Sequence, residues 1–248
     1  MFKFVSISLP LIQFKKYVMP AMKPRIMLIL IQVFSTLLIY AVPVLIPAGI
    51  RAWISAWVFL GLWFGFWLLI LLWLYLQNPD LFWERMLVRV SNQKGWDKLV
   101  RPLLYVAVFI WLLFTAYDAG HFHWSPVPEW VELLGALILI VSFILFFLTF
   151  RENAYLSPVV RVQEDRGQVV ISTGPYQFIR HPMYAATLIF VLGTPLLLGA
   201  WYGILVGPIV AFILVWRTIL EERTLQKELP GYYEYMARTK YRLIPFIW

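Results

Sequence analysis

The residues that could do chemistry gather around two apolar segments in the last third of the chain. Residues 180–184 read Arg-His-Pro-Met-Tyr, at the start of the apolar segment 183–198. Pro182 suits the first position of a helix, where its missing N–H costs nothing. His181 would then stand at a helix N-terminus, whose unpaired backbone N–H groups can hold a carboxylate or another anion. The plainer alternative is a membrane-interface segment in which Arg and Tyr act only as anchors.

A second polar group accompanies the next apolar segment, residues 202–220. Arg217 and Glu221 are four residues apart and therefore share one face of a helix. Arg217 lies near a depth where an unpaired charge is expensive, so we expect it to have a partner or a function. It could simply pair with Glu221 and extend to the interface. Glu222 is rotated by about 100° from Glu221 around the helix, so the two carboxylates need not serve one ligand.

Other reactive groups are few. The chain has no cysteine, which excludes disulfides, thiolate metal sites and a cysteine nucleophile. Of its three histidines, His121 and His123 lie near Asp118 and Glu129. Two histidines without a third strong ligand would bind a metal only weakly, so we expect no metal.

Membrane helices must position these residues. The chain of 248 residues is 62% hydrophobic and 14% charged, whereas soluble domains are roughly 45–50% apolar and roughly 25% charged. A helix needs roughly 20 apolar residues to cross the hydrocarbon core. Six segments approach this length: residues 26–46, 53–76, 103–119, 131–150, 183–198 and 202–220. The sequence therefore predicts an all-α, polytopic membrane protein whose last two helices form a hairpin.

The basic residues indicate the orientation of these helices. Twenty of the 21 Lys and Arg residues lie on one side of a six-helix arrangement, and only Arg51 lies on the other. Because cytoplasmic loops carry the excess of positive charge, we expect both termini in the cytosol. The net charge of +8 then reflects this excess rather than nucleic-acid binding. The apolar stretch of residues 1–11 is typical of an interfacial helix and not of a cleaved signal peptide.

Several motifs of the C-terminal part, taken together, resemble one family. They are Gly174-Pro175-Tyr176, the Arg-His-Pro-Met-Tyr run, Glu221-Glu222 and the closing Tyr235 with Ile244-Pro245. In this order they resemble the isoprenylcysteine carboxyl methyltransferases, part of a wider group of membrane methyltransferases that includes phospholipid N-methyltransferases. The resemblance is strongest over residues 163–248. Three upstream segments are similar to bacterial members: Asn78-Pro79-Asp80, Glu84-Arg85-Met86 and Trp96-Asp97-Lys98.

The resemblance implies an activity and a site. Members of the family use S-adenosylmethionine, so it implies an integral membrane methyltransferase with a cytosolic cofactor pocket. The residues implied at the cofactor are Gln163, Gln168, Val169, Val170, Ile171, Tyr176, His181, Pro182, Met183, Tyr184 and Glu221. Arg217 would hold the methyl acceptor, and a carboxylate acceptor would need no base. An amine or thiol acceptor would need one, for which Glu222 or His181 is the candidate.

The resemblance also implies the partners and the location. The implied acceptor is lipid-like, most specifically the carboxylate of a prenylated cysteine or an analogue, with membrane lipids around the protein and no nucleic acid or metal. We expect residues 1–150 to hold four N-terminal helices and residues 151–248 to form the methyltransferase core. The bacterial motifs favour a bacterial cytoplasmic membrane, with the endoplasmic reticulum as the alternative.

Other functions stay open at this point. Within the same class, the acceptor could be a phospholipid amine or a small thiol. In a different class, the chain could be a membrane transporter or scaffold. The scarcity of charges at mid-depth disfavours a transporter, and a scaffold would have no affinity for the cofactor.

Overall fold

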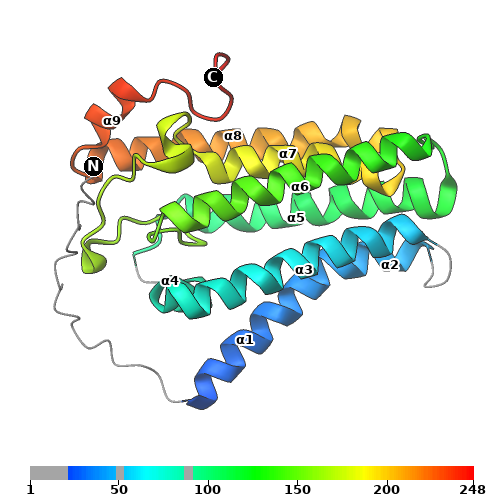
Figure 1. The fold of residues 1–248 in the computed structure, drawn as a ribbon, viewed down its shortest axis with the longest axis horizontal. Coiled ribbons are helices and arrows are strands. Elements are labelled where there is room, and N and C mark those ends of the chain that lie inside the picture. Colours follow the sequence, from blue (N-terminus) through cyan, green and yellow to red (C-terminus); the bar gives the residue numbers. More distant parts are fainter. Residues whose placement is uncertain (1–21, 49–52, 87–91) are drawn as a thin grey trace, which may run out of the picture.

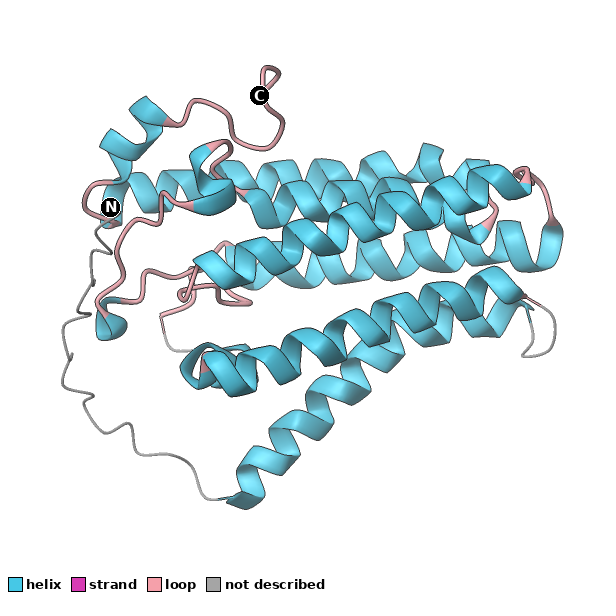
Figure 2. Ribbon diagram, viewed as in Figure 1, coloured by secondary structure: helices cyan, strands magenta, loops and turns pink. Residues whose placement is uncertain are grey.

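The computed structural model describes residues 22–48, 53–86 and 92–248, and this part of the chain consists of α-helices joined by loops (Figure 1, Figure 2). The helices are α1 (Met22–Thr36), α2 (Val42–Ala48), α3 (Ile54–Gln77), α4 (Pro79–Met86), α5 (Asp97–Tyr117), α6 (Glu129–Glu152), α7 (Pro182–Leu198), α8 (Trp201–Glu228) and α9 (Tyr232–Arg238). Two π-helical turns, Leu37–Ala41 and Asp118–Phe122, join α1 to α2 and extend α5. The predicted all-α fold is confirmed.

Five helices of the described chain are long and apolar enough to cross a membrane. They are Met27–Pro47, Ile54–Gln77, Asp97–Phe122, Glu129–Glu152 and Trp201–Glu228. The remaining predicted segment is also helical, but α7 has only 17 residues, which gives a length of about 26 Å at 1.5 Å per residue. The chain is therefore a polytopic membrane protein with five candidate spans, and α7 is the shortest of the six predicted helices.

The outer surface of the bundle carries large apolar side chains. Leu68, Leu69, Leu205 and Phe212 each leave between 67% and 72% of their area exposed. Soluble proteins rarely expose contiguous apolar patches of more than a few hundred Å². Lipid tails, which are as apolar as leucine, can cover such side chains without a penalty.

Helix packing brings the C-terminal helices close together. α6 lies along α7, α7 along α8 and α8 along α5 (Figure 1). Gly135 on α6 and Gly193 on α7 permit the first of these approaches, because a Cβ on either glycine would meet atoms of the other helix. The aromatic rings of Trp63, Phe143 and Phe190 pack against one another in the centre. The same core includes Val210 and Leu214 of α8, so it packs α7 and α8, whose ends carry the predicted site residues, into the bundle.

The predicted hairpin of the last two helices is confirmed. α7 ends at Leu198 and α8 begins at Trp201, with Gly199 between them at φ 92°. This left-handed backbone favours glycine, which has no Cβ to clash. The backbone N–H of Trp201 donates to the carbonyl of Ser125 at 3.0 Å, and buried Asp118 accepts from the N–H of Ser125 at 2.9 Å. Asp118 thus serves to hold the hairpin against the loop between α5 and α6.

Some predictions are not tested by this architecture. Residues 1–11 and Arg51 lie outside the described residues. The boundary predicted between residues 150 and 151 falls within the last turn of α6, which ends at Glu152. The division into two parts and the cytosolic placement of both termini stay predictions.

The packing of α6 on α7 gives a first testable prediction. A Cβ added at Gly135 would collide with the backbone of Leu196 and Leu197, whereas one added at Gly61 on α3 would meet nothing within 4 Å. We expect Gly135→Ala to lower the free energy of unfolding by about 1–3 kcal/mol, and Gly61→Ala to cause no loss. Thermal unfolding of the detergent-solubilised protein measures both, and equal stability of the two variants would contradict this packing.

Candidate active site

A cavity is lined by residues of α4, of the start of α7 and of the end of α8. Figure 1 shows these three segments at the same end of the bundle. The walls of the cavity come from α4, α5, α7, α8, α9 and the loop between α6 and α7. This loop follows Glu152 and includes two 3₁₀ turns, Glu164–Arg166 and Gly174–Gln177. Figure 2 shows the loop at the same end of the bundle as α9. Segments that are distant in the sequence therefore surround one space.

Most of the predicted site residues line this cavity. They are Gln168, Val169, Val170, Ile171, Tyr176, His181, Pro182, Met183, Tyr184, Arg217 and Glu221. Gln163 and Glu222 are not among the residues that line it. The fold thus brings most of the predicted set together, while the role of each residue toward a ligand stays a prediction.

Residues 181–184 (His-Pro-Met-Tyr), at the start of α7, form one part of the cavity wall. α7 begins at Pro182, as predicted, and the ring of His181 stacks on that of Tyr184 with centroids 5.6 Å apart. The Tyr184 hydroxyl donates a hydrogen bond to Glu221 on α8. His181 Nε2 is buried and has no hydrogen-bond partner within the described residues, although Glu222 Oε1 lies 3.4 Å away. Hydrogen-bonding capacity is therefore left over on a residue of the cavity wall.

Arg217 has a partner, but not the one that its sequence neighbours indicate. Its Nε donates to Asp97 Oδ1 at 3.0 Å, and its Nη2 donates to the carbonyl of Pro158 at 3.3 Å. Its guanidinium also lies 5.6 Å from the centre of the Tyr184 ring. Among the described residues, Glu221 forms no ion pair with Arg217. The predicted need of Arg217 for a partner is thus met from α5, while the alternative pair with Glu221 is wrong.

Sequence reasoning did not find the role of Asp97. This residue is fully buried at the start of α5. Its Oδ2 accepts from the backbone N–H of Val160 at 3.0 Å and from the side chain of Gln93 at 2.9 Å. The one signal was its place in a segment similar to bacterial members of the family. Asp97 therefore joins α5, α8 and the loop between α6 and α7.

Glu222 belongs to an ion cluster beside the cavity. Its Oε1 accepts from Arg180 Nε at 2.5 Å, and its Oε2 accepts from Arg242 Nε at 2.6 Å. The Glu222 side chain is almost fully buried. Because both oxygens already bind guanidinium N–H groups and neither lines the cavity, Glu222 is not suited to accept a proton from a bound acceptor. In the structure Glu222 anchors the C-terminal tail through Arg242, and its role toward an acceptor stays a prediction.

The C-terminal tail, residues 239–248, lies against the segment that precedes α7. The Arg180 side chain donates from Nη1 to the carbonyls of Thr239 and Lys240, at 2.7 and 2.8 Å. The backbone N–H of Arg180 donates to the carbonyl of Tyr241, and that of His181 donates to the carbonyl of Arg242. The tail thus holds the segment that carries His181 in place.

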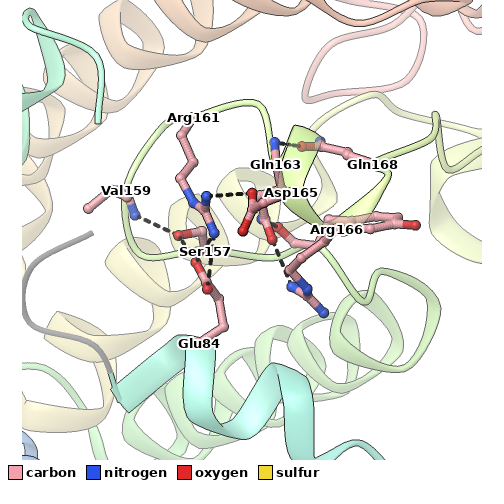
Figure 3. A network of polar contacts seen from close by, with 9 residues as sticks. Glu84, Ser157, Val159, Arg161, Gln163, Asp165, Arg166 and Gln168 are labelled. Carbon is pink, nitrogen blue, oxygen red and sulfur yellow. Dashed lines mark hydrogen bonds and ion pairs between the residues drawn. The ribbon is translucent and has the colours of Figure 1, made fainter. Parts of the chain in front are cut away.

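A polar network holds the loop between α6 and α7 over α4 (Figure 3). Arg161 pairs with Glu84 on α4 at 3.2 Å and with Asp165 at 3.0 Å. Gln163 is buried and donates from its backbone N–H to Gln168 Oε1 at 2.8 Å. Gln163 therefore supports Gln168, which lines the cavity, instead of lining it as predicted.

Burial also sets the protonation of groups in the wall. It raises the pKa of Tyr235 to about 12, and the neutral hydroxyl donates to the carbonyl of Tyr176 at 2.7 Å. It raises the pKa of Tyr232 as well. Burial lowers the pKa of Arg85, and the positive charge of Arg217 adds to this effect, whereas Tyr105 and Glu84 oppose it. The wall thus presents neutral phenols beside cationic guanidinium groups.

The fold and the cavity define a class of protein, an integral membrane protein of apolar helices with a polar, arginine-rich cavity at one end of the bundle. Residues 130–230 match a family model described as phospholipid methyltransferase. The protein-S-isoprenylcysteine O-methyltransferase of Schizosaccharomyces pombe is 24% identical over 140 residues, which cover 54% of this chain and 54% of that protein. The chain thus spans about half the length of this curated relative. Over these residues the chain is similar to membrane methyltransferases of both kinds.

The ion cluster around Glu222 gives a second prediction. Glu222→Ala leaves Arg180 and Arg242 without their carboxylate, and loss of one partner of a buried pair is strongly destabilising. We expect trypsin to release the tail beyond Lys240 roughly tenfold faster or more, measured by mass spectrometry. Glu228→Ala is the control, because Glu228 forms only a partly exposed pair with Lys94 on the same side. Equal release from both variants would contradict the anchoring role.

Proposed function

We propose that the chain is an S-adenosylmethionine-dependent methyltransferase that acts on a lipid-like acceptor at the membrane surface. The observation that carries the proposal is the convergence of residues 168–171, His181 and Glu221 around one cavity. The family match over residues 130–230 supports the same class of reaction. A transporter or a scaffold would require neither this family match nor this set of side chains.

The cavity wall has free polar groups that fit S-adenosylmethionine. His181 Nε2 and the Tyr232 hydroxyl are buried and lack hydrogen bonds within the described residues. Residues 169–171 make no backbone–backbone hydrogen bonds in that part of the chain. Because unpaired buried polar groups are costly, His181 Nε2 and the Tyr232 hydroxyl fit a polar ligand, to which the backbone of residues 169–171 offers further donors and acceptors.

Each end of this ligand has a matching group. The N-terminus of α7 suits its carboxylate, and Glu221 suits its amine or ribose. The residues proposed to line the cofactor are those from Gln168 to Ile171, Tyr176, those from His181 to Tyr184, and Glu221.

The proposed acceptor is the carboxylate of a prenylated cysteine or an analogue. When bound, S-adenosylmethionine supplies an activated methyl group on its sulfonium. The protein then mainly aligns the acceptor and stabilises its charge. A carboxylate is ionised near neutral pH and needs no base. Arg217 lines the cavity with its guanidinium fixed by Asp97 and Pro158, so it is suited to orient a carboxylate through charge-assisted hydrogen bonds.

A second candidate is a phospholipid amine, which the description of the matching family favours. An amine or a thiol acceptor needs a base. His181 is the candidate base, because it lines the cavity, whereas Glu222 is occupied by two guanidinium groups.

We propose that the cavity faces the cytosol. Arg85, Arg161, Arg180 and Arg217 all line it, which agrees with the excess of positive charge on the cytoplasmic side of membrane proteins. Water-soluble cofactor would then enter from the cytosol, and a lipid-like acceptor from the bilayer. A bacterial cytoplasmic membrane is the proposed location, with the endoplasmic reticulum as the alternative.

Cofactor binding tests the proposal directly. Calorimetry on the folded, detergent-solubilised chain should detect binding of S-adenosylmethionine. His181→Ala and Glu221→Gln should each weaken it roughly tenfold, the effect of losing about 1.4 kcal/mol of polar contact. His121→Ala is the control, because His121 is exposed at the opposite end of the bundle. A folded wild type that does not bind would exclude this function.

Arg217 separates cofactor binding from transfer. We expect Arg217→Gln and Arg217→Lys to retain cofactor binding and to lose transfer of labelled methyl to extracted lipids by roughly 100-fold, because neither offers the guanidinium fork. Thermal stability is measured in parallel, since Asp97 would be left without its cation. If cofactor affinity falls as much as transfer does, Arg217 acts at the cofactor or in folding instead.

A further inference from the structure

The arginines of the cavity wall differ in how their charge is balanced. Arg161 pairs with Glu84 at 3.2 Å, Arg180 with Glu222 at 2.5 Å and Arg217 with Asp97 at 3.0 Å. Arg85 also lines the cavity, yet it forms no ion pair or hydrogen bond with any residue that the structure describes. All 13 acidic residues of the chain are among those described, and none of them forms an ion pair with Arg85.

The surroundings of Arg85 keep it beside the cavity. Its guanidinium lies 5.1 Å from the centre of the Phe150 ring, an arrangement that attracts a cation without neutralising it. Its sequence neighbour Glu84 is turned to Arg161 and Ser157 instead. The positive charge of Arg217 acts on Arg85. Two guanidinium groups that line one cavity and whose charges act on each other favour an anion between them.

The position of α4 indicates the depth of this charge. α4 follows the membrane-spanning helix α3 after a single residue, Asn78. Its apolar side chains Leu81, Phe82 and Met86 are buried, while Arg85 lines the cavity. A short helix of this kind directly after a span lies near the membrane surface, which is where lipid head groups are found.

We propose that Arg85 is a second acceptor-binding residue, which together with Arg217 holds the anionic oxygens of the acceptor's head group. This inference rests on the proposed function and narrows its substrate class to lipids with a negatively charged head, a carboxylate or a phosphodiester. Planar guanidinium groups match both kinds of anion through paired N–H donors. Arg85 supplies a positive charge that forms no ion pair with the described residues, and Arg217, held in place by Asp97, orients the head group.

The test compares anionic probes with neutral ones. The full chain is loaded with S-adenosylhomocysteine in detergent, and binding is measured for N-acetyl-S-farnesylcysteine and its methyl ester. A second pair is lysophosphatidylglycerol, whose phosphodiester is its only charged group, and monoacylglycerol, which lacks this phosphodiester. We expect the wild type to prefer the anionic member of one pair by roughly tenfold or more, and that pair identifies the anion. Arg85→Gln should abolish the preference, and Arg85→Lys should keep part of it.

Arg223→Gln is the matched control, because Arg223 is exposed on α8 and does not line the cavity. It should retain the full preference, and all variants should bind S-adenosylhomocysteine as the wild type does. The inference is overturned if the wild type shows no preference in either pair, or if Arg85→Gln keeps the preference. It is also overturned if Arg85→Gln weakens S-adenosylhomocysteine binding, because Arg85 would then serve the cofactor. A wild type that fails to bind S-adenosylhomocysteine refutes the proposed function itself.

Discussion

The buried pair of Asp97 and Arg217 is the interaction on which the cavity depends. An isolated charge within an apolar bundle costs several kcal/mol, and a pair repays this cost only when its remaining hydrogen-bonding capacity is satisfied. Asp97 meets this condition by accepting from Arg217, from the backbone of Val160 and from Gln93. One carboxylate therefore fixes both the direction of Arg217 and the course of the loop that forms the opposite wall.

Glu222 anchors the C-terminal tail, as Asp97 anchors the loop between α6 and α7. It binds Arg180 before α7 and Arg242 in the tail, so the N-terminus of α7, the end of α8 and the tail are joined at one point. Apolar packing can set the helices side by side, but it cannot order irregular segments that bury little surface. In this protein, carboxylate–guanidinium pairs that are shielded from water order those segments, whereas the partly exposed pair of Lys94 and Glu228 would contribute much less.

The helices could be predicted from the sequence because their signal is local. Each apolar segment is long enough to be recognised alone, and Pro182 marks the start of α7 without reference to the rest of the chain. The partners of the charged residues are not local. Asp97 lies 120 residues before Arg217, so their pairing depends on how α5 packs on α8. The pairing of Glu222 could not be predicted for the same reason, since its partner Arg242 reaches it only after the tail has folded back.

The residues in and around the cavity come from two parts of the sequence, one inside and one outside the region that matches the family model. The residues proposed for the cofactor, from Gln168 to Glu221, fall within the region that matches the family model. Asp97 and Arg85 lie upstream of it, on α5 and α4. The match over residues 130–230 therefore bears on the proposed donor site and on Arg217. Arg85, which lines the cavity, and Asp97, which holds Arg217, lie outside it, so the acceptor has to be inferred from the charges around the cavity.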